Sequence, residues 1–319
     1  FFLFFLFICT CILNVTAQQS NINALKDSFI SIATDAISAG QGDIGVATSA
    51  DAFSQFWNPS KYIFSDKKCE TGVNQIVGTR SEFDESSQLN LVFYNKFNIR
   101  SAYSLSFRGY SYSTDQFQSI QTNSELSIAS SYALRLSETF SMSVGGRYVI
   151  LGGKTSILDY YDSGVKSLYG IDVSGFYYGN EIAYKKFNGR WRAGFNFSNL
   201  RGESLNNTKQ LEVYAPSNLG VGIGFDFIFN QNKVLGITSE YKTLLDSYNK
   251  DKDGEKLAMG LEGSVIAMGL EFIYRKKLVL RTGYSYGINR ITDSFASFGT
   301  GLKGKSVDVN IAWLLGLSE

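Results

Sequence analysis

The stretch NLGVGIGFDFIFN, residues 218–230, alternates apolar side chains with small or polar ones. Leu219, Val221, Ile223, Phe225, Phe227 and Phe229 share one face, and Gly220, Gly222, Gly224 and Asp226 share the other. Such runs, of about 11 to 14 residues, are roughly twice as long as the usual strand of a soluble domain. At about 3.3 Å per residue and a tilt near 40°, they span the roughly 25 to 30 Å of a bilayer's apolar band. The stretch therefore predicts a membrane-crossing β-strand.

The same alternation recurs along the chain from about residue 70 onward. It predicts strands near 71–79, 88–97, 100–112, 124–137, 140–151, 168–184, 190–199, 218–229, 233–244, 262–273, 277–287, 294–302 and 306–314. Short turns, such as Asn98-Ile99, alternate with longer loops, such as residues 79–87, 111–122 and 152–166. An outer-membrane barrel has short turns in the periplasm and long loops outside the cell. The pattern predicts an all-β fold, a transmembrane antiparallel up-and-down β-barrel.

The number of predicted strands is odd, whereas bacterial single-chain barrels have an even number. Each backbone group left unsatisfied at a strand edge in lipid costs roughly several kcal/mol. We therefore expect one further strand to complete the barrel that begins at residue 69.

The composition excludes several classes of function. The 319 residues carry a net charge of +1, which gives no electrostatic reason to expect a nucleic-acid partner. The chain has no histidine, so it cannot hold a Ser-His-Asp triad, a Cys-His pair or a histidine metal ligand. No spacing of carboxylates or of serine and lysine favours another catalytic pair. We expect a protein that is not an enzyme, with no catalytic residue and no cofactor.

The first residues predict export. An apolar run from Phe1 to Leu13 precedes Val15-Thr16-Ala17, the small-residue pattern at which a signal peptidase cuts. We interpret residues 1–17 as a signal peptide without its true start, and the alternative is a buried core helix. Cys69 is then the only cysteine of the mature chain, so we expect a lone thiol and no intrachain disulfide.

A second informative stretch is AGQGDIGVATSADAFSQFWNPSKY, residues 39–62. Its glycines, Gly40, Gly42 and Gly45, have the G-x-G-x-x-G spacing of a dinucleotide-binding turn, but no alternation of strands and helices follows. Glycine also permits tight turns and close backbone approach, which a segment inside a crowded barrel lumen requires. We expect residues 18–68 to plug a barrel formed by residues 69–319, with a short helix over 46–57 that Asn58-Pro59 ends.

The segment NKDKDG, Asn249 to Gly254, has the first offsets of a calcium loop. Position 12 of such a loop should be a bidentate Glu, and here it is Gly260. We interpret the segment as a solvated charged loop and expect no metal site.

The plug stretch resembles the N-terminal signature of the FadL superfamily of outer-membrane barrels and, more narrowly, of the PorV family of the type IX secretion system. The matching residues are Asp35, Ala36, Gly40, Gly42, Asp43, Gly45, Val46, Ala47, Thr48, Asp51, Ala52, Ser54, Trp57, Asn58, Pro59, Lys61 and Tyr62. Further similar stretches are YSLSFRGYS, WRAGFNFSNL, APSNLGVGIGFDFIF, ITSEYKTLL and GLEFIYRKKLVLRTGYSYG. Two positions depart from the family pattern: Ile37 replaces the usual Arg, and Phe56 replaces a common His.

The resemblance implies a 14-stranded barrel in the bacterial outer membrane, with Gly40, Gly42, Gly45, Asp51, Trp57, Asn58 and Pro59 in the plug motif. It implies binding of secreted cargo proteins through their C-terminal signal domain, and transfer from the translocon to a surface attachment complex with a sortase-like enzyme. The residues that bind cargo are not identified by the sequence. The alternatives are a FadL-like transporter of fatty acids or other hydrophobic small molecules, and a purely structural outer-membrane protein. The loops, rich in Ser, Asn, Asp and Lys, favour cargo binding over capture of apolar ligands.

Overall fold

The computed structural model describes residues 34–81, 84–116, 119–152, 166–204, 217–245, 264–288 and 294–316. The signal peptide predicted over residues 1–17 and the rejected calcium loop at 249–254 lie outside these ranges. Within them, no helix is long and apolar enough to cross a membrane.

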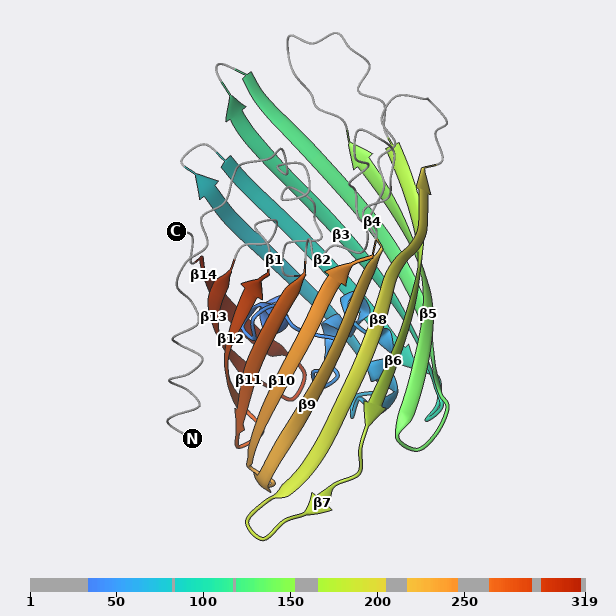
Figure 1. The fold of residues 1–319 in the computed structure, drawn as a ribbon, viewed down its shortest axis with the longest axis vertical. Helices are drawn as coiled ribbons and strands as arrows, with labels where there is room; N and C mark the ends of the chain where they lie inside the picture. The colour runs from blue at the N-terminus through green and yellow to red at the C-terminus, as the bar shows by residue number, and fades with distance from the viewer. Residues whose placement is uncertain are drawn as a thin grey trace.

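The described residues form one antiparallel sheet of fourteen strands, which curls into a barrel (Figure 1). Each long strand pairs with its neighbours in the sequence, and the two-residue β7 pairs only with β8. The strands are β1 (Cys69–Ser81), β2 (Asp84–Lys96), β3 (Ser101–Gln116), β4 (Ser119–Arg135), β5 (Phe140–Gly152), β6 (Lys166–Tyr178), β7 (Ile182–Ala183), β8 (Asn188–Ser204), β9 (Asn218–Asn230), β10 (Lys233–Leu244), β11 (Val265–Tyr274), β12 (Leu278–Gly287), β13 (Phe295–Lys303) and β14 (Asp308–Gly316). The predicted up-and-down barrel topology is confirmed.

The prediction of long loops at 79–87 and 111–122 is wrong. β1 continues to Ser81 and β2 starts at Asp84, while β3 continues to Gln116 and β4 starts at Ser119. These segments are polar, and strand pairing satisfies backbone N–H and C=O groups whatever the side chains are. The apolar pattern therefore marks the part of each strand that faces lipid and not the end of its pairing.

The strand predicted over 168–184 is divided in the structure. β6 ends at Tyr178, and the chain then forms a hairpin with β7 that reaches below the other turns (Figure 1). β8 runs on to Ser204, past the predicted end at 199. The β6–β8 register shifts near Ile171, and Asn199 has a φ of 57°. A β-bulge at Asn199 shifts the register, and β8 continues to pair beyond the residue at which the apolar alternation ends.

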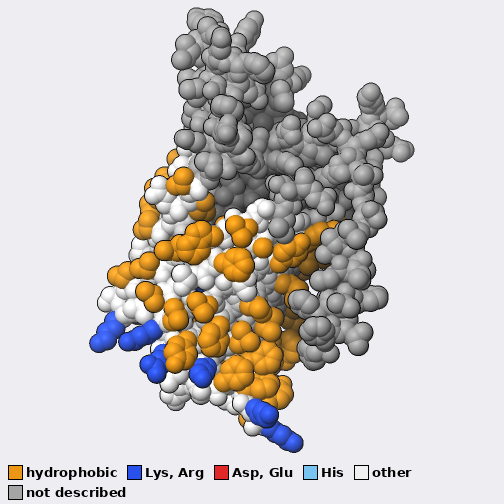
Figure 2. Space-filling model, turned by 90° about the vertical axis from the view of Figure 1, so that its left-hand side faces the viewer, with side chains coloured by type: hydrophobic (Ala, Val, Ile, Leu, Met, Phe, Trp, Pro, Cys, Tyr) orange, Lys and Arg blue, Asp and Glu red, His pale blue; other side chains and the backbone are white. Residues whose placement is uncertain are grey.

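The apolar face of the sheet is exposed, as a lipid-facing surface requires. On β9, Val221, Ile223 and Phe229 are exposed, whereas Gly222 and Asp226 point into the barrel. On the face shown in Figure 2, hydrophobic side chains form a broad band across the barrel. Near the turn end, Trp191 packs edge-on against Phe225 with ring centroids 4.7 Å apart. Aromatic side chains at this level are typical of the girdle of an outer-membrane barrel.

The two edge strands of the sheet, β1 and β14, face each other without pairing. Among the described residues β1 pairs only with β2, and β14 pairs only with β13. At the turn end Lys67 Nζ lies 2.9 Å from Asp308 Oδ2, which connects the two edges. The further strand expected from the sequence stays a prediction.

Residues 34–65 lie inside the barrel as three short helices (Figure 1). They are α3 (Ala36–Ala39) and two 3-10 helices, η2 (Ala52–Phe56) and η3 (Pro59–Phe64). Asp51 caps η2, and Asn58 caps η3 with Pro59 at its first position. The predicted helix is therefore shorter than 46–57, and Asn58-Pro59 both follows its end and starts the next helix. Ser54 competes with the backbone for hydrogen bonds, and Pro59 is favoured only in the first turn of a helix. Two short helices are therefore favoured over one continuous helix.

Candidate functional site

The candidate functional site is the plug, defined here as residues 34–65, together with the barrel wall around it. The plug contacts all thirteen long strands in the part of the chain that the structure describes. Its partners, from β1 to β13, are Asn74, Asn90, Ser104, Ser131, Ser141, Gly175, Arg192, Gly222, Glu240, Gly269, Gly283 and Ser297, and α3 also lies against β14. α3 thus spans the gap between the unpaired edges, because Ala36 N donates to Asn74 Oδ1 on β1.

Glycines on the inner wall make room for the plug. A Cβ atom on Gly283 would lie 2.0 Å from the carbonyl carbon of Gln41, and one on Gly194 would lie 2.4 Å from Val46 O. Within the plug, Gly42 has a φ of 82°, and a Cβ there would meet the backbone of β12 at Tyr284, 2.9 Å away. Backbone therefore packs directly on backbone, which only glycine allows.

Glu240 holds the plug on β10. Its side chain is 2% exposed, with Oε1 accepting from Ala47 N at 2.8 Å and Oε2 accepting from Gly45 N at 3.0 Å. On β8, Arg192 donates to Ala47 O at 2.6 Å and forms a two-pronged ion pair with Asp226. A buried carboxylate and a buried guanidinium thus bind donors and acceptors of the same plug turn, and charge-assisted hydrogen bonds of this kind are strong.

These contacts explain the glycine pattern that resembles a dinucleotide-binding turn. The amides of Gly42 and Gly45 donate to Ser297 Oγ and to Glu240, respectively. Two of the backbone donors that a phosphate would need are therefore bound by the barrel's own side chains.

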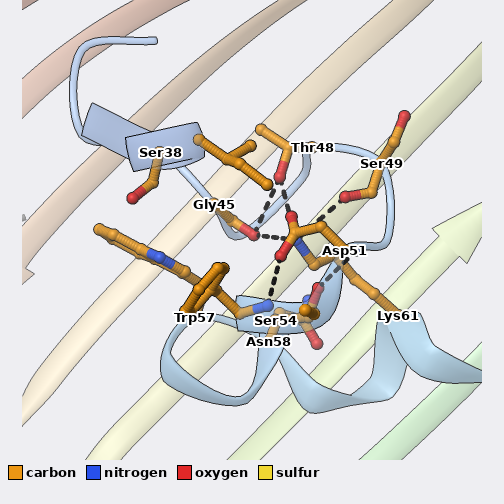
Figure 3. A network of polar contacts seen from close by, with 12 residues as sticks. Ser38, Gly45, Thr48, Ser49, Asp51, Ser54, Trp57, Asn58 and Lys61 are labelled. Atoms are coloured by element: carbon orange, nitrogen blue, oxygen red, sulfur yellow. Dashed lines mark hydrogen bonds and ion pairs between the residues drawn. The ribbon is translucent and has the colours of Figure 1, made fainter. Parts of the chain in front are cut away.

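Lys61 is the central cation of the plug (Figure 3). Its side chain is fully buried, and Nζ donates to Gly45 O at 2.7 Å, to Thr48 Oγ1 at 2.9 Å and to Ser49 O at 3.3 Å. Asp51 Oδ2 lies 3.8 Å from Nζ. Burial lowers the pKa of Lys61, and the nearby Asp51 carboxylate opposes that shift. The amino group ties the loop before η2 to η3, so the plug is a folded unit.

Burial also raises the pKa of the Asp51 carboxyl to about 6, although Lys61 acts in the opposite direction. Asp51 accepts a hydrogen bond from Phe53 N at 2.7 Å, while its own N–H donates to Ser54 Oγ at 3.1 Å. This capping box fixes the start of η2.

The remaining motif residues fasten the plug to itself and to the wall. Trp57 Nε1 donates to Asp35 Oδ2 at 3.1 Å, and its ring covers Gly45, where a Cβ would lie 2.2 Å from Trp57 Cγ. Asn58 Nδ2 donates to Val46 O at 2.9 Å and to Gly175 O on β6 at 3.0 Å.

The two residues that depart from the family pattern pack against the same cluster. Ile37 and Phe56 both pack against a small buried cluster made of Ala52, Phe53 and Val92. Apolar side chains packed against this cluster therefore occupy the positions where the family pattern has an Arg and a common His.

Sequence reasoning missed Glu240 and Arg192 as parts of this site. The available signal was a charged side chain at an inward-facing position of a membrane strand, where charge is costly unless it is paired. Most of the predicted long loop over residues 152–166 lies outside the described residues. Within the described ranges no group of three or more Cys, Asp or Glu side chains could hold a metal ion.

A cavity of about 810 Å³ lies between the plug and the turns. Aromatic side chains line it from both the plug and the wall, among them Phe64, Phe176 and Tyr178. Its charged lining residues include Arg190, whose guanidinium lies over the Tyr178 ring at 4.4 Å and pairs with Glu181.

The geometry fits what comparison with known proteins finds. The model of the family "Type IX secretion system protein PorV" matches residues 15–250, which include the whole plug and β1 to β10. The chain belongs to the PorV family. It is therefore an outer-membrane protein of the type IX secretion system, in a family of transport proteins. No curated protein sequence is significantly similar to this PorV family member.

Solved structures similar to this PorV family member show the fold. The TodX monoaromatic hydrocarbon channel, as its deltaS2 mutant, has a TM-score of 0.58 at 12% identity, covering 91% of this chain and 94% of that chain. The toluene transporter TbuX of Ralstonia pickettii has a TM-score of 0.55 at 13% identity, covering 91% and 95%. The CymD monoaromatic hydrocarbon channel has a TM-score of 0.55 at 14% identity, covering 91% and 94%. The chain therefore shares the fold of these channels and transporters.

Proposed function

We propose that this protein is a shuttle that binds secreted cargo through its C-terminal signal domain. It would receive cargo as it leaves the translocon and carry it to the cell-surface attachment complex, where a sortase-like enzyme removes the signal. Membership of the PorV family supports this proposal. No catalytic residue of its own is required, because the chemistry belongs to the attachment complex.

The proposed position of cargo on the barrel rests on one observation. The plug contacts every long strand that the structure describes. A lumen filled in this way leaves no path for a folded protein domain, so the cargo binds on the outer loops and the barrel rim. The buried contacts of Glu240, Arg192 and Lys61 make the plug an internal brace. A braced barrel presents its loops from a rigid scaffold, and a rigid scaffold reduces the ordering cost of binding.

The test is a pull-down of the full-length protein from detergent-solubilised outer membranes. We expect cargo that retains its C-terminal domain to co-purify, and cargo without that domain to be absent. Deletion of the gene should leave signal-bearing cargo uncleaved in the periplasm while fatty-acid uptake is unchanged.

The FadL-like transporter is the competing function, and the aromatic-lined cavity of about 810 Å³ is the observation in its favour. Uptake of a hydrophobic small molecule would require a path past the plug. Loss of uptake with normal secretion in the deletion strain would favour the transporter and contradict the shuttle.

A further inference from the structure

The turns of the barrel carry an excess of positive charge. Four successive turns, from the β7–β8 hairpin to the β13–β14 turn, present Lys185, Lys186, Lys233, Arg275, Lys276, Lys277, Lys303 and Lys305, and all eight are exposed. We call these residues the basic turn surface. Among the described residues none of the eight forms an ion pair, whereas the acidic residues of the same turns, Glu181 and Asp308, are paired with Arg190 and Lys67.

This surface is a local feature, because the whole chain has a net charge of only +1. Figure 2 shows Lys and Arg side chains gathered below the hydrophobic band of the barrel. Short turns of an outer-membrane barrel face the periplasm. A concentrated positive potential on that face attracts an acidic partner and speeds its association.

The β11–β12 turn retains two cations in an unfavourable backbone conformation. Arg275 and Lys276 have φ values of 52° and 56°, and Lys277 N donates to Tyr274 O at 3.1 Å to close the turn. A turn with two left-handed central residues strongly prefers Asn-Gly. Backbone conformations of this kind are often found at functional sites, and here they hold two cations at the tip of the turn.

The basic turn surface borders the cavity described above. Lys186, Lys276 and Lys303 belong to the cavity lining, together with aromatic side chains such as Tyr184 and Phe187. Arg190 Nε, at the same cavity, is buried and has no hydrogen-bond partner among the described residues. The volume of about 810 Å³ is within the range of sites that bind ligands. The lining also contains Asp66, Glu181, Asp226 and Glu271, and the last three of these pair with arginines. The cavity thus offers apolar contact surface beside lysines that form no ion pair among the described residues.

We propose that the basic turn surface and this cavity bind an acidic, aromatic-containing peptide segment of a periplasmic protein. Carboxylates of the segment pair with the turn lysines, and its aromatic side chains enter the cavity between the turns and the plug. Anionic lipid headgroups would also meet lysines on the turns. However, Lys186, Lys276 and Lys303 line a cavity inside the barrel, and this position favours a peptide over a lipid surface. The inference does not depend on the proposed binding of cargo.

The experiment uses the full-length protein in phosphatidylcholine nanodiscs and a fluorescein-labelled peptide of alternating Glu and Phe, with binding followed by fluorescence anisotropy. We expect saturable binding that weakens about 10-fold in the variant Lys276→Glu/Lys303→Glu. The matched control, Lys68→Glu/Arg100→Glu, makes the same charge change at exposed positions of the same barrel end that do not line the cavity. Equal loss in both variants would overturn the proposal.

Two further comparisons separate the parts of the site. A peptide with Ser in place of Phe should bind more weakly, and equal binding would exclude a role for the cavity. The variant Arg275→Asn/Lys276→Gly should relieve the turn while weakening peptide binding, and unchanged binding would exclude a role for the strained turn. If the Glu-Phe peptide does not bind, but phosphatidylglycerol enriches around the unaltered protein and not around Lys276→Glu/Lys303→Glu, the partner is lipid and the proposal is wrong.

Discussion

At the scale of single residues, the plug depends on buried charges that each serve several backbone groups. Glu240 accepts from two plug amides, and Lys61 donates to three oxygens around the same turn. Both side chains are buried, so water cannot replace the hydrogen-bond partners of Glu240 or Lys61. Removing one partner from a buried, hydrogen-bonded set is costly because the remaining groups keep their desolvation penalty.

We predict that Glu240→Gln loosens the plug. The amide has one acceptor oxygen, so its NH₂ group meets Gly45 N–H or Ala47 N–H and leaves that donor unsatisfied, at a cost of about 1–3 kcal/mol. Trypsin cleavage after Lys61, which is fully buried in the docked plug, should become about 10-fold faster. Glu138→Gln, at an exposed turn position, is the control. Equal cleavage rates in Glu240→Gln and the unaltered protein would contradict the anchoring role.

We predict that acid stabilises the plug through Asp51. The pKa of its carboxyl is raised to about 6 from 3.8, so the folded protein binds this proton more tightly than the unfolded chain does. The resulting stability is present at low pH and is lost as pH rises through about 6. The unfolding temperature should therefore fall between pH 5 and pH 7, and Asp51→Asn should reduce this difference by about 2–4 °C. Asp66→Asn, at an exposed position, should keep the full difference.

At the scale of elements, each inner strand face is shaped to its part of the plug. Gly194 on β8, Gly269 on β11 and Gly283 on β12 lie where a side chain would collide with plug backbone. Gly146 on β5 is different, since a Cβ there would meet nothing within 4 Å. The period-two alternation predicts which strand positions face inward. The alternation also places Gly146 on the outward face of β5, but it does not predict how closely the plug approaches an inward-facing glycine.

We predict that Gly283→Ala displaces the plug segment around Gln41. The added methyl group would lie 2.0 Å from a backbone carbon, so one backbone must move, and overpacking of this kind costs about 1–3 kcal/mol. The unfolding temperature should fall and trypsin cleavage after Lys61 should accelerate. Gly146→Ala is the matched control, with the same change on the same type of strand. Similar behaviour of the two variants would show that the inner wall tolerates side chains against the plug.

At the scale of the whole molecule, the sequence predicts all thirteen long strands and their order, because lipid on one face imposes a strict period of two. Strand ends are less predictable. Polar residues such as Thr114 and Asp115 continue the pairing of β3 beyond its predicted end at residue 112. Within the site, the motif residues Trp57 and Asn58 were predictable as plug residues. Their partners on the wall, such as Gly175 O, depend on long-range register that no local pattern encodes.

The contact of the plug with every long strand has a consequence for biogenesis. Its backbone lies against β8, β11 and β12 more closely than a methyl group would permit, so a finished cylinder could not admit it without spreading apart. The plug also precedes all the strands in the chain, and α3 touches both the first strand and the last. The β-hairpins therefore have to close around a plug that is already folded, so the plug serves as a template for barrel assembly.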